Sequence, residues 1–160
     1  MDGKQVPTAL VAALTECGVN GALLTREDSP ELTAERGAYL LLLGHAHPID
    51  VIYRKTPGIF PPGWYVYAGN AYGPGGIGAR VARHFRRGKP RHWHIDGLTD
   101  DAALFAILLP GRIECDLLAG LRKQRGFAVP APGFGSSDCR ICESHLLLWR
   151  PEGYQPGRMP

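Results

Sequence analysis

The sequence lacks any apolar run long enough to cross a membrane, and its first residues do not have the charged-then-apolar layout of a secretory signal. Cysteine is also scarce, with four residues in a chain of 160. A disulfide framework of the kind found in small secreted domains is therefore not expected. We expect a soluble, cytoplasmic protein whose cysteines are reduced or bound to a metal.

Acidic residues are missing from one stretch, although the net charge of the whole chain is only +3. Residues 80–91 contain no aspartate or glutamate, and their basic side chains are Arg80, Arg83, Arg86, Arg87, Lys89 and Arg91. Such a cluster favours binding to the phosphates of a nucleic acid, and the alternative is a solvated helix end. His92 and His94 follow on a strand face or a loop, where they either touch phosphate or serve packing.

Glycine (21 residues) and proline (14) are abundant, which predicts short elements joined by long connections. The 44% hydrophobic content suits one domain with a self-sufficient core. We divide the chain into an N-terminal helical arm at 1–33, a core domain at 34–150 and a disordered tail at 151–160. The arm is expected to pack loosely on the core or on a partner.

Local patterns place the elements of the core. Leu40 to Leu43 lie between Gly37 and Gly44, too short a run for a good helix, so they predict a buried strand. A second strand at 50–54 is expected to form a hairpin with the first. We predict further strands at 64–68, 104–109 and 146–149, helices at 6–14, 77–85 and 114–121, turns at 56–58 and 69–70, and a loop at 130–137. The predicted fold class is α/β (α+β), a small, mostly antiparallel β-sheet flanked by helices.

A glycine-rich motif stands between the strand at 64–68 and the helix at 77–85. Gly73 to Gly78 satisfies G-x-G-x-x-G, and Asp96 lies eighteen residues beyond it, as in a dinucleotide-binding fingerprint. The chain lacks the repeated βαβ units of a dinucleotide fold, and the helix that follows is short and ends in arginines. A pyridine-nucleotide protein is therefore kept only as the third hypothesis.

The helix at 77–85 carries the first functional signal. Ile77, Arg80, Val81 and His84 share one stripe at i, i+3, i+4, i+7 spacing. An apolar stripe should carry an arginine and a histidine only if they face something polar. Arg80 and His84 are therefore candidate site residues.

Three motifs, in chain order, resemble the GIY-YIG nuclease superfamily: Gly37-Ala38-Tyr39, Tyr67-Ala68-Gly69 and Ile77-x-x-Arg80-x-x-x-His84. Glu114, in the pattern E-x-x-L-L at the start of a helix, matches the metal-binding glutamate of that superfamily. Ala38 and Ala68 stand in place of isoleucine, and these small apolar changes should preserve the strands. The connection between the tyrosine motifs is longer than in compact members, because it holds an extra strand and turns.

Later phrases are similar to one branch of that superfamily, the DUF123 family, which is found alone or attached to endonuclease III-type glycosylases. These phrases are His92-Trp93-His94-Ile95-Asp96, the G-F-G-S-S-D-C run at 133–139, and Ser144-His145-Leu146. The resemblance covers about residues 36–150. It implies DNA as a partner, an endonuclease III-type glycosylase as a second partner, and a role in DNA repair or processing.

The resemblance implies divalent-metal-dependent hydrolysis of a phosphodiester bond. Glu114 would bind Mg²⁺ or Mn²⁺, which stabilises the leaving oxyanion as a Lewis acid. Arg80 would hold the scissile phosphate, and His84 would hydrogen-bond a tyrosine or a phosphate. Tyr39 or Tyr67 would orient or deprotonate the attacking water, but a phenol with a pKa near ~10 is a poor base unless cations lower it. The second hypothesis is a nucleic-acid-binding module that keeps the fold and does not cut.

A second metal pattern lies near the end of the core: Cys139-x-x-Cys142-x-x-His145, with Cys115 or His92 as the candidate fourth ligand. A single CxxC is only half of a zinc site, because structural zinc takes four ligands in a tetrahedral array. We therefore favour reduced cysteines that line the core beside the last strand over structural Zn²⁺.

Overall fold

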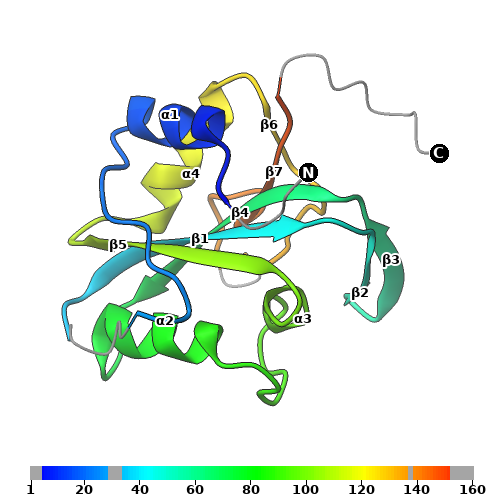
Figure 1. Ribbon diagram of the computed structural model, residues 1–160, viewed down its shortest axis with the longest axis horizontal. Coiled ribbons are helices and arrows are strands. Elements are labelled where there is room, and N and C mark those ends of the chain that lie inside the picture. Colours follow the sequence, from blue (N-terminus) through cyan, green and yellow to red (C-terminus); the bar gives the residue numbers. More distant parts are fainter. Residues whose placement is uncertain (1–4, 29–33, 137–138, 152–160) are drawn as a thin grey trace.

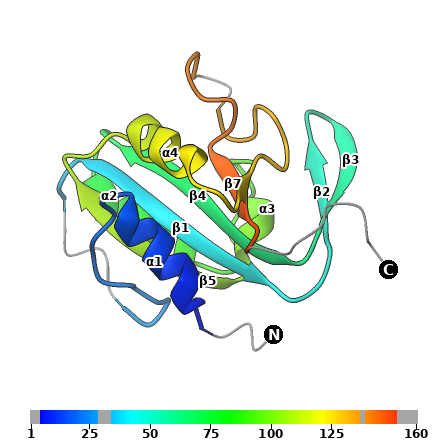
Figure 2. The same ribbon diagram turned by 90° about the horizontal axis from the view of Figure 1, so that it is seen from above.

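A five-stranded antiparallel sheet forms the centre of the protein, with helices on both faces (Figure 1). The computed structural model describes residues 5–28, 34–136 and 139–151. The strand order is β5 (Ala103–Pro110), β1 (Gly37–His45), β4 (Gly63–Ala71), β7 (Leu146–Trp149) and β6 (Phe127–Ala128). Figure 2 shows, from above, one face covered by α1 (Thr8–Glu16) and α4 (Glu114–Lys123), and the other face is covered by α2 (Gly76–Phe85) and α3 (Asp96–Thr99). The predicted fold class is confirmed.

The central strand β1 is buried along its whole length, which explains its run of leucines. It pairs with β4 on one side and with β5 on the other. Successive side chains of a strand point to opposite faces. Leu41 and Leu43 therefore pack in the cluster on the α2 side, and Leu40 and Leu42 pack in the cluster on the α1 and α4 side. The predicted buried strand is confirmed.

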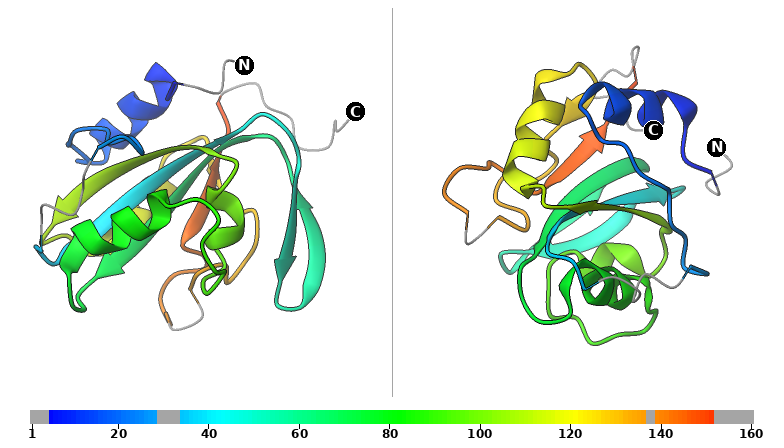
Figure 3. Two further views of the ribbon diagram at one scale, coloured as in Figure 1. Left: turned by 60° about the horizontal axis from the view of Figure 1, so that its bottom comes forward. Right: turned by 90° about the vertical axis from the view of Figure 1, so that its left-hand side faces the viewer.

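The second strand does not pair with the first, so the predicted hairpin between them is wrong. β2 (Ile49–Tyr53) instead pairs with β3 (Thr56–Phe60) in a separate two-stranded sheet, which extends away from the main sheet (Figure 3). The turn lies at Arg54 and Lys55, with φ of 49° and 63°, and not at 56–58 as predicted. Tight hairpin turns with two positive φ angles are usually signalled by Asn-Gly, and an Arg-Lys pair gives no such signal.

The N-terminal arm packs tightly on the sheet, so the loose packing expected from the sequence is wrong. Leu10 and Leu14 of α1 are 0% and 1% exposed and share a cluster with Leu117 of α4. Leu24 forms an antiparallel bridge with Ala106 of β5. The described part of the arm therefore belongs to the hydrophobic core.

Most of the other predicted elements are observed with small shifts at their ends. The helices predicted at 77–85 and 114–121 and the strands at 104–109 and 146–149 are confirmed as α2, α4, β5 and β7. Apart from residue 151, the predicted tail lies outside the described residues. None of the helices in the described ranges is both long and apolar enough to cross a membrane.

The glycine-rich motif packs the start of α2 against the preceding chain. A side-chain atom on Gly76, which has a φ of +64°, would overlap with the carbonyl group of Ala34. The N–H of Ile77 donates to the carbonyl of Glu35 at 2.9 Å. Glycine is therefore required for close packing here. The antiparallel sheet also differs from the parallel sheet of a dinucleotide fold, which argues against the pyridine-nucleotide hypothesis.

Candidate functional site

A pocket of about 350 Å³ opens beside the outer edge of β4. β7 pairs with β4 only from Trp64 to Tyr67, and in the described part of the chain no strand pairs with that edge from Gly69 onward. Tyr39 and Tyr67 reach the pocket from the α2 side of the sheet, whereas Glu114 reaches it from the start of α4. The open edge therefore brings together side chains from both faces of the sheet.

Four of the five predicted catalytic residues line this pocket, namely Tyr39, Tyr67, Arg80 and Glu114. The fifth, His84, lies behind Tyr39, with its Nε2 atom 2.8 Å from the tyrosine hydroxyl. Tyr39 is 2% exposed and His84 is 0% exposed. His84 can therefore act on the pocket only through its neighbours, and its contact with a tyrosine is the first of the two roles that the sequence suggested.

Gly69 allows the ring of Tyr39 to cross the neighbouring strand. The two residues are partners in the β1–β4 ladder, and a Cβ atom on Gly69 would overlap with the tyrosine ring and its hydroxyl. β4 continues through Gly69 and Asn70 to Ala71, so the predicted end of the strand at 69–70 is wrong. A glycine inside a strand can mark a close approach rather than a turn, and local sequence does not separate the two.

Burial dominates the acid–base properties of the tyrosines and of His84. It raises the pKa of Tyr67 to about 12 against the lowering effect of Arg80, and it raises the pKa of Tyr39 well above its ordinary value. Burial also lowers the pKa of His84 to about 3. Both phenols therefore keep their protons at neutral pH, and the imidazole is neutral.

Trp93 and Asp96 hold the arginines of α2 in place. The guanidinium carbons of Arg80 and Arg83 lie 4.9 and 4.1 Å from the centre of the Trp93 ring. Arg83 also donates to both carboxylate oxygens of Asp96, at 2.8 and 2.9 Å. Asp96 is 1% exposed and accepts the N–H groups of His92 and Trp93. Burial raises the pKa of Asp96, but these hydrogen bonds outweigh it and bring the pKa to about 2.

Glu114 brings a buried carboxylate to the pocket. It is 8% exposed, and its Oε1 atom accepts a hydrogen bond of 2.7 Å from Nδ2 of Asn70. Its Oε2 atom has no hydrogen-bond partner among the described residues. A buried carboxylate oxygen without a partner is costly, and a hard divalent cation would satisfy it. The residues present therefore fit Mg²⁺ or Mn²⁺.

Comparison with known proteins assigns the chain to a family. A family model described as "Domain of unknown function DUF123" matches residues 38–155, a range that includes every residue of the pocket. The chain belongs to the DUF123 family. The predicted resemblance to that family is confirmed, while α1 lies outside the matched residues. No curated protein and no solved structure matches the chain.

The prediction from sequence missed three residues that shape this site, namely Asn70, Asp96 and Trp93. Asn70 orients Glu114, but an asparagine after a strand is typical of a turn. Asp96 and Trp93 fix the arginines of α2. The signal that was present is the match of residues 92–96 to a family phrase, which gave neither side chain a role in holding the arginines.

Lys89, one of the predicted nucleic-acid-binding residues, is hydrogen-bonded inside the DUF123 domain. It is 8% exposed, and its ammonium group donates to the carbonyls of His84 and Arg86 and to the hydroxyl of Thr99. Arg83, bound to Asp96, is likewise engaged inside the protein. Two of the predicted nucleic-acid contacts are thus held by internal partners.

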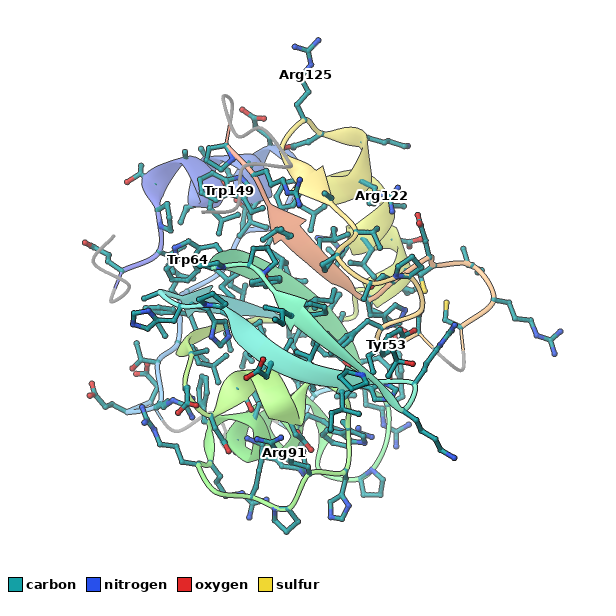
Figure 4. The ribbon with its side chains drawn as sticks, turned by 90° about the vertical axis from the view of Figure 1, so that its right-hand side faces the viewer. Tyr53, Trp64, Arg91, Arg122, Arg125 and Trp149 are labelled. Carbon is teal, nitrogen blue, oxygen red and sulfur yellow. The ribbon has the colours of Figure 1, made fainter. Side chains whose placement is uncertain are left out.

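The remaining predicted nucleic-acid-binding residues are exposed, and two of them line the pocket. His92 and His94 lie on a loop, line the pocket and are exposed. The ring of His94 also contacts Tyr53 edge-on, at 5.6 Å between centroids. Figure 4 shows Arg91 on the side of the sheet opposite Arg122 and Arg125. The exposed basic side chains from the run are Arg86, Arg87 and Arg91.

A four-residue group borders the same pocket and consists of Cys115, Cys139, Cys142 and His145. Their candidate ligand atoms all lie within 4.8 Å of one another, so the group could hold a metal ion. Of the two candidates for the fourth position, Cys115 belongs to the group and His92 does not. Backbone N–H groups of Cys142 and Ile141 lower the pKa of Cys139 to about 6, whereas burial raises the pKa of Cys142.

Proposed function

We propose that this DUF123 protein is a divalent-metal-dependent endonuclease that hydrolyses a phosphodiester bond of DNA. The supporting observation is that one pocket holds Arg80, two tyrosines and Glu114, a buried carboxylate with one oxygen that has no partner among the residues the structure describes. The similarity of the motifs to GIY-YIG nucleases supports the same chemistry. We also propose that the protein acts in the cytoplasm, in DNA repair or processing, with an endonuclease III-type glycosylase as a partner.

Glu114 would hold the cation, with Asn70 keeping the carboxylate in a fixed orientation through its hydrogen bond to Oε1. When bound, Mg²⁺ or Mn²⁺ supplies Lewis-acid stabilisation of the charge that develops on phosphate oxygens. Asn70 pairs with Oε1, whereas Oε2 has no hydrogen-bond partner among the described residues. Oε2 is therefore the oxygen that would bind the cation.

Arg80 would hold the scissile phosphate. Its side chain lines the pocket, and it forms no ion pair with any acid in the described residues. Contact with Trp93 limits the conformations of the guanidinium without occupying all of its donors. The group is therefore arranged for charge-assisted, bidentate hydrogen bonds to a phosphate.

The tyrosines would orient the attacking water rather than deprotonate it. Burial raises the pKa of both phenols, so each offers a hydroxyl that donates and accepts hydrogen bonds at neutral pH. His84 fixes the direction of the Tyr39 hydroxyl from behind. Of the two roles considered for the tyrosines, orientation of the attacking water fits the buried environment better.

The decisive experiment uses the full-length protein with supercoiled plasmid, branched DNA and single strands, in Mg²⁺, Mn²⁺ or EDTA. Glu114→Gln is the informative variant, because it keeps an oxygen for Asn70 and removes the charge that binds the cation. Asp116→Asn is the matched control, since Asp116 is exposed on the first turn of the same helix. We expect metal-dependent nicking in the wild type and in Asp116→Asn, and none in Glu114→Gln.

The second candidate is a DNA-binding module that does not cut. The exposed arginines 86, 87 and 91 favour it, because they suit the phosphate backbone without any catalytic group. Retention of DNA that weakens with salt, with no cleavage under any metal condition, would replace the nuclease proposal with this one. Equal nicking by wild type and Glu114→Gln would remove Glu114 from the proposed site.

A further inference from the structure

Three cysteines and a histidine come together from two parts of the chain. The proposed reaction does not use them. Cys115 lies on the first turn of α4, and Cys139, Cys142 and His145 lie in the segment that leads into β7. Cys115 and Cys139 are 24 residues apart in sequence, yet their sulfur atoms are 3.6 Å apart. The sequence motif therefore provides three ligands, and the tertiary fold adds the fourth, Cys115.

The spacing of the sulfur atoms matches ligands on a shared zinc ion. A zinc–thiolate bond is about 2.3 Å, so two thiolates on one tetrahedral zinc lie about 3.8 Å apart. The 3.6 Å between Cys115 and Cys139 is close to this value. A disulfide would require about 2.05 Å between the sulfurs. The distance is compatible with two ligands on one ion and excludes a bonded pair.

Two further contacts suit a metal at this position. The backbone N–H of Cys142 donates to the sulfur of Cys139 at 3.3 Å, and such donors stabilise the thiolate form that binds metals. His145 is 6% exposed, and its Nε2 atom has no hydrogen-bond partner among the described residues. A buried imidazole nitrogen without a partner is costly, and a metal ion would satisfy it.

We propose that Cys115, Cys139, Cys142 and His145 bind a structural Zn²⁺ ion. Thiolate and imidazole ligands select zinc over the hard cations that suit the carboxylate of Glu114. Four protein ligands fill a tetrahedral zinc and leave no open position for water, so this ion does not take part in hydrolysis. The protein thus has two neighbouring metal sites of different chemistry. Glu114 belongs to one site, and the next residue, Cys115, belongs to the other.

The zinc fixes one wall of the pocket. Cys115 directly follows Glu114, so the ion holds the start of α4 against the segment that contains Cys139 and His145. In the same loop, a Cβ atom on Gly135 would come within 2.9 Å of the Tyr67 ring, which shows how closely the loop covers that tyrosine. The backbone carbonyl of His145 accepts the N–H of Ala68 at 3.0 Å, which ties the segment to β4.

The test is the metal content of the full-length, untagged wild-type protein, purified without added metal and without chelators. We expect one zinc per chain by elemental analysis. The double variant Cys139→Ser, Cys142→Ser should lose it. Cys17→Ser is the matched control, because Cys17 is hydrogen-bonded to Gln124, outside the four-residue group, and should leave the zinc in place.

Replacement of the zinc by Co²⁺ provides a second readout on the wild-type protein, which does not depend on whether a variant folds. Tetrahedral coordination by thiolates should give intense visible d–d bands and sulfur-to-cobalt charge transfer. A metal-free wild type in which all four cysteines react with a thiol reagent would overturn the proposal. A Cys115–Cys139 disulfide, or iron in place of zinc, would overturn it as well.

The outcome is independent of nuclease activity. Glu114→Gln should lose cleavage and keep its zinc, whereas loss of zinc from that variant would contradict the separation of the two sites. A zinc-containing protein that never cuts DNA would remove the proposed function and leave the zinc site standing.

Discussion

The hydroxyl of Tyr39 and Nε2 of His84 lie 2.8 Å apart in a region from which solvent is almost completely excluded. Tyr39 belongs to the central strand and His84 to the helix packed on it, 45 residues later in the chain. The pair connects the pocket with the core behind it. Because burial sets the pKa of both groups, the contact is one between neutral partners.

Stability should fall as the pH drops below the ordinary pKa of histidine. His84 has a pKa of about 3 when folded and 6.5 as the ordinary value, so between these pH values the unfolded state binds a proton that the folded state does not. This group should cost about 2–3 kcal/mol of stability at a pH of ~4.5. Urea unfolding at neutral pH and at that pH measures it. His84→Gln should reduce the pH dependence, and His47→Gln, at an exposed position, should not.

Gly69→Ala should disrupt the pocket, because the added methyl group overlaps with the ring of Tyr39. Overpacking of this kind typically costs about 1–3 kcal/mol. Gly58→Ala in β3 is the matched control, since its Cβ atom would meet Val51 at an ordinary 3.6 Å. Thermal and urea unfolding compare the two. A cost no larger for Gly69→Ala than for Gly58→Ala would show that the tyrosine ring moves aside freely.

Asp96→Asn should destabilise the protein by roughly 3–5 kcal/mol, because it leaves Arg83 half-buried without its partner. Asp96 has a lowered pKa of about 2 in the folded state, so its contribution is present at neutral pH and is lost as the pH falls from about 4 through 2. Glu143→Gln, which removes the exposed pair with Arg122, should cost under about 1 kcal/mol. Similar unfolding midpoints for the two variants would contradict the role given to Asp96.

Arg80→Ala should lower cleavage by roughly 100- to 1,000-fold if this side chain stabilises charge on the phosphate. Arg80→Lys should recover little, because a lysine cannot make the bidentate contact. Arg122→Ala, on the exposed surface of α4, should cleave like the wild type. Single-turnover plasmid nicking is the measurement, with circular dichroism to confirm folding. Wild-type rates in Arg80→Ala would exclude this arginine from the site.

Leu10→Ala should cost about 2–5 kcal/mol, although Leu10 lies outside the residues that the family model matches. Its side chain is 0% exposed, against 38% for Leu23 in the same arm. Leu23→Ala should therefore change the free energy of unfolding much less. Equal, small effects in urea unfolding would mean that the arm is dispensable to the core.

Local patterns were sufficient where one element determines its own structure. The leucine run at 40–43 identified a strand buried on both faces, and the stripe that ends in His84 identified α2. They failed where the structure of an element depends on contacts with another part of the chain. β2 pairs with β3 rather than β1, and Gly69 lies inside β4 because the ring of Tyr39 crosses it.

The same division applies to the candidate site. The sequence picked out Tyr39, Tyr67, Arg80 and Glu114, and all four line one pocket. It did not indicate Asn70, whose role depends on a hydrogen bond to a residue 44 positions away. Nor did it indicate the internal role of Lys89, because a run of charges does not show which member folds inward.

The sequence by itself determined which residue types are present, their order, and the periodicities that make strands and helices. Only the tertiary structure decided that β7 stops at the partner of Tyr67, which leaves the edge of β4 open to side chains from both faces. It also decided that Cys115 rather than His92 completes the cysteine group, and that burial keeps the phenols protonated. These properties depend on distances between residues far apart in the chain and on exclusion of solvent, and neither is encoded in a local pattern.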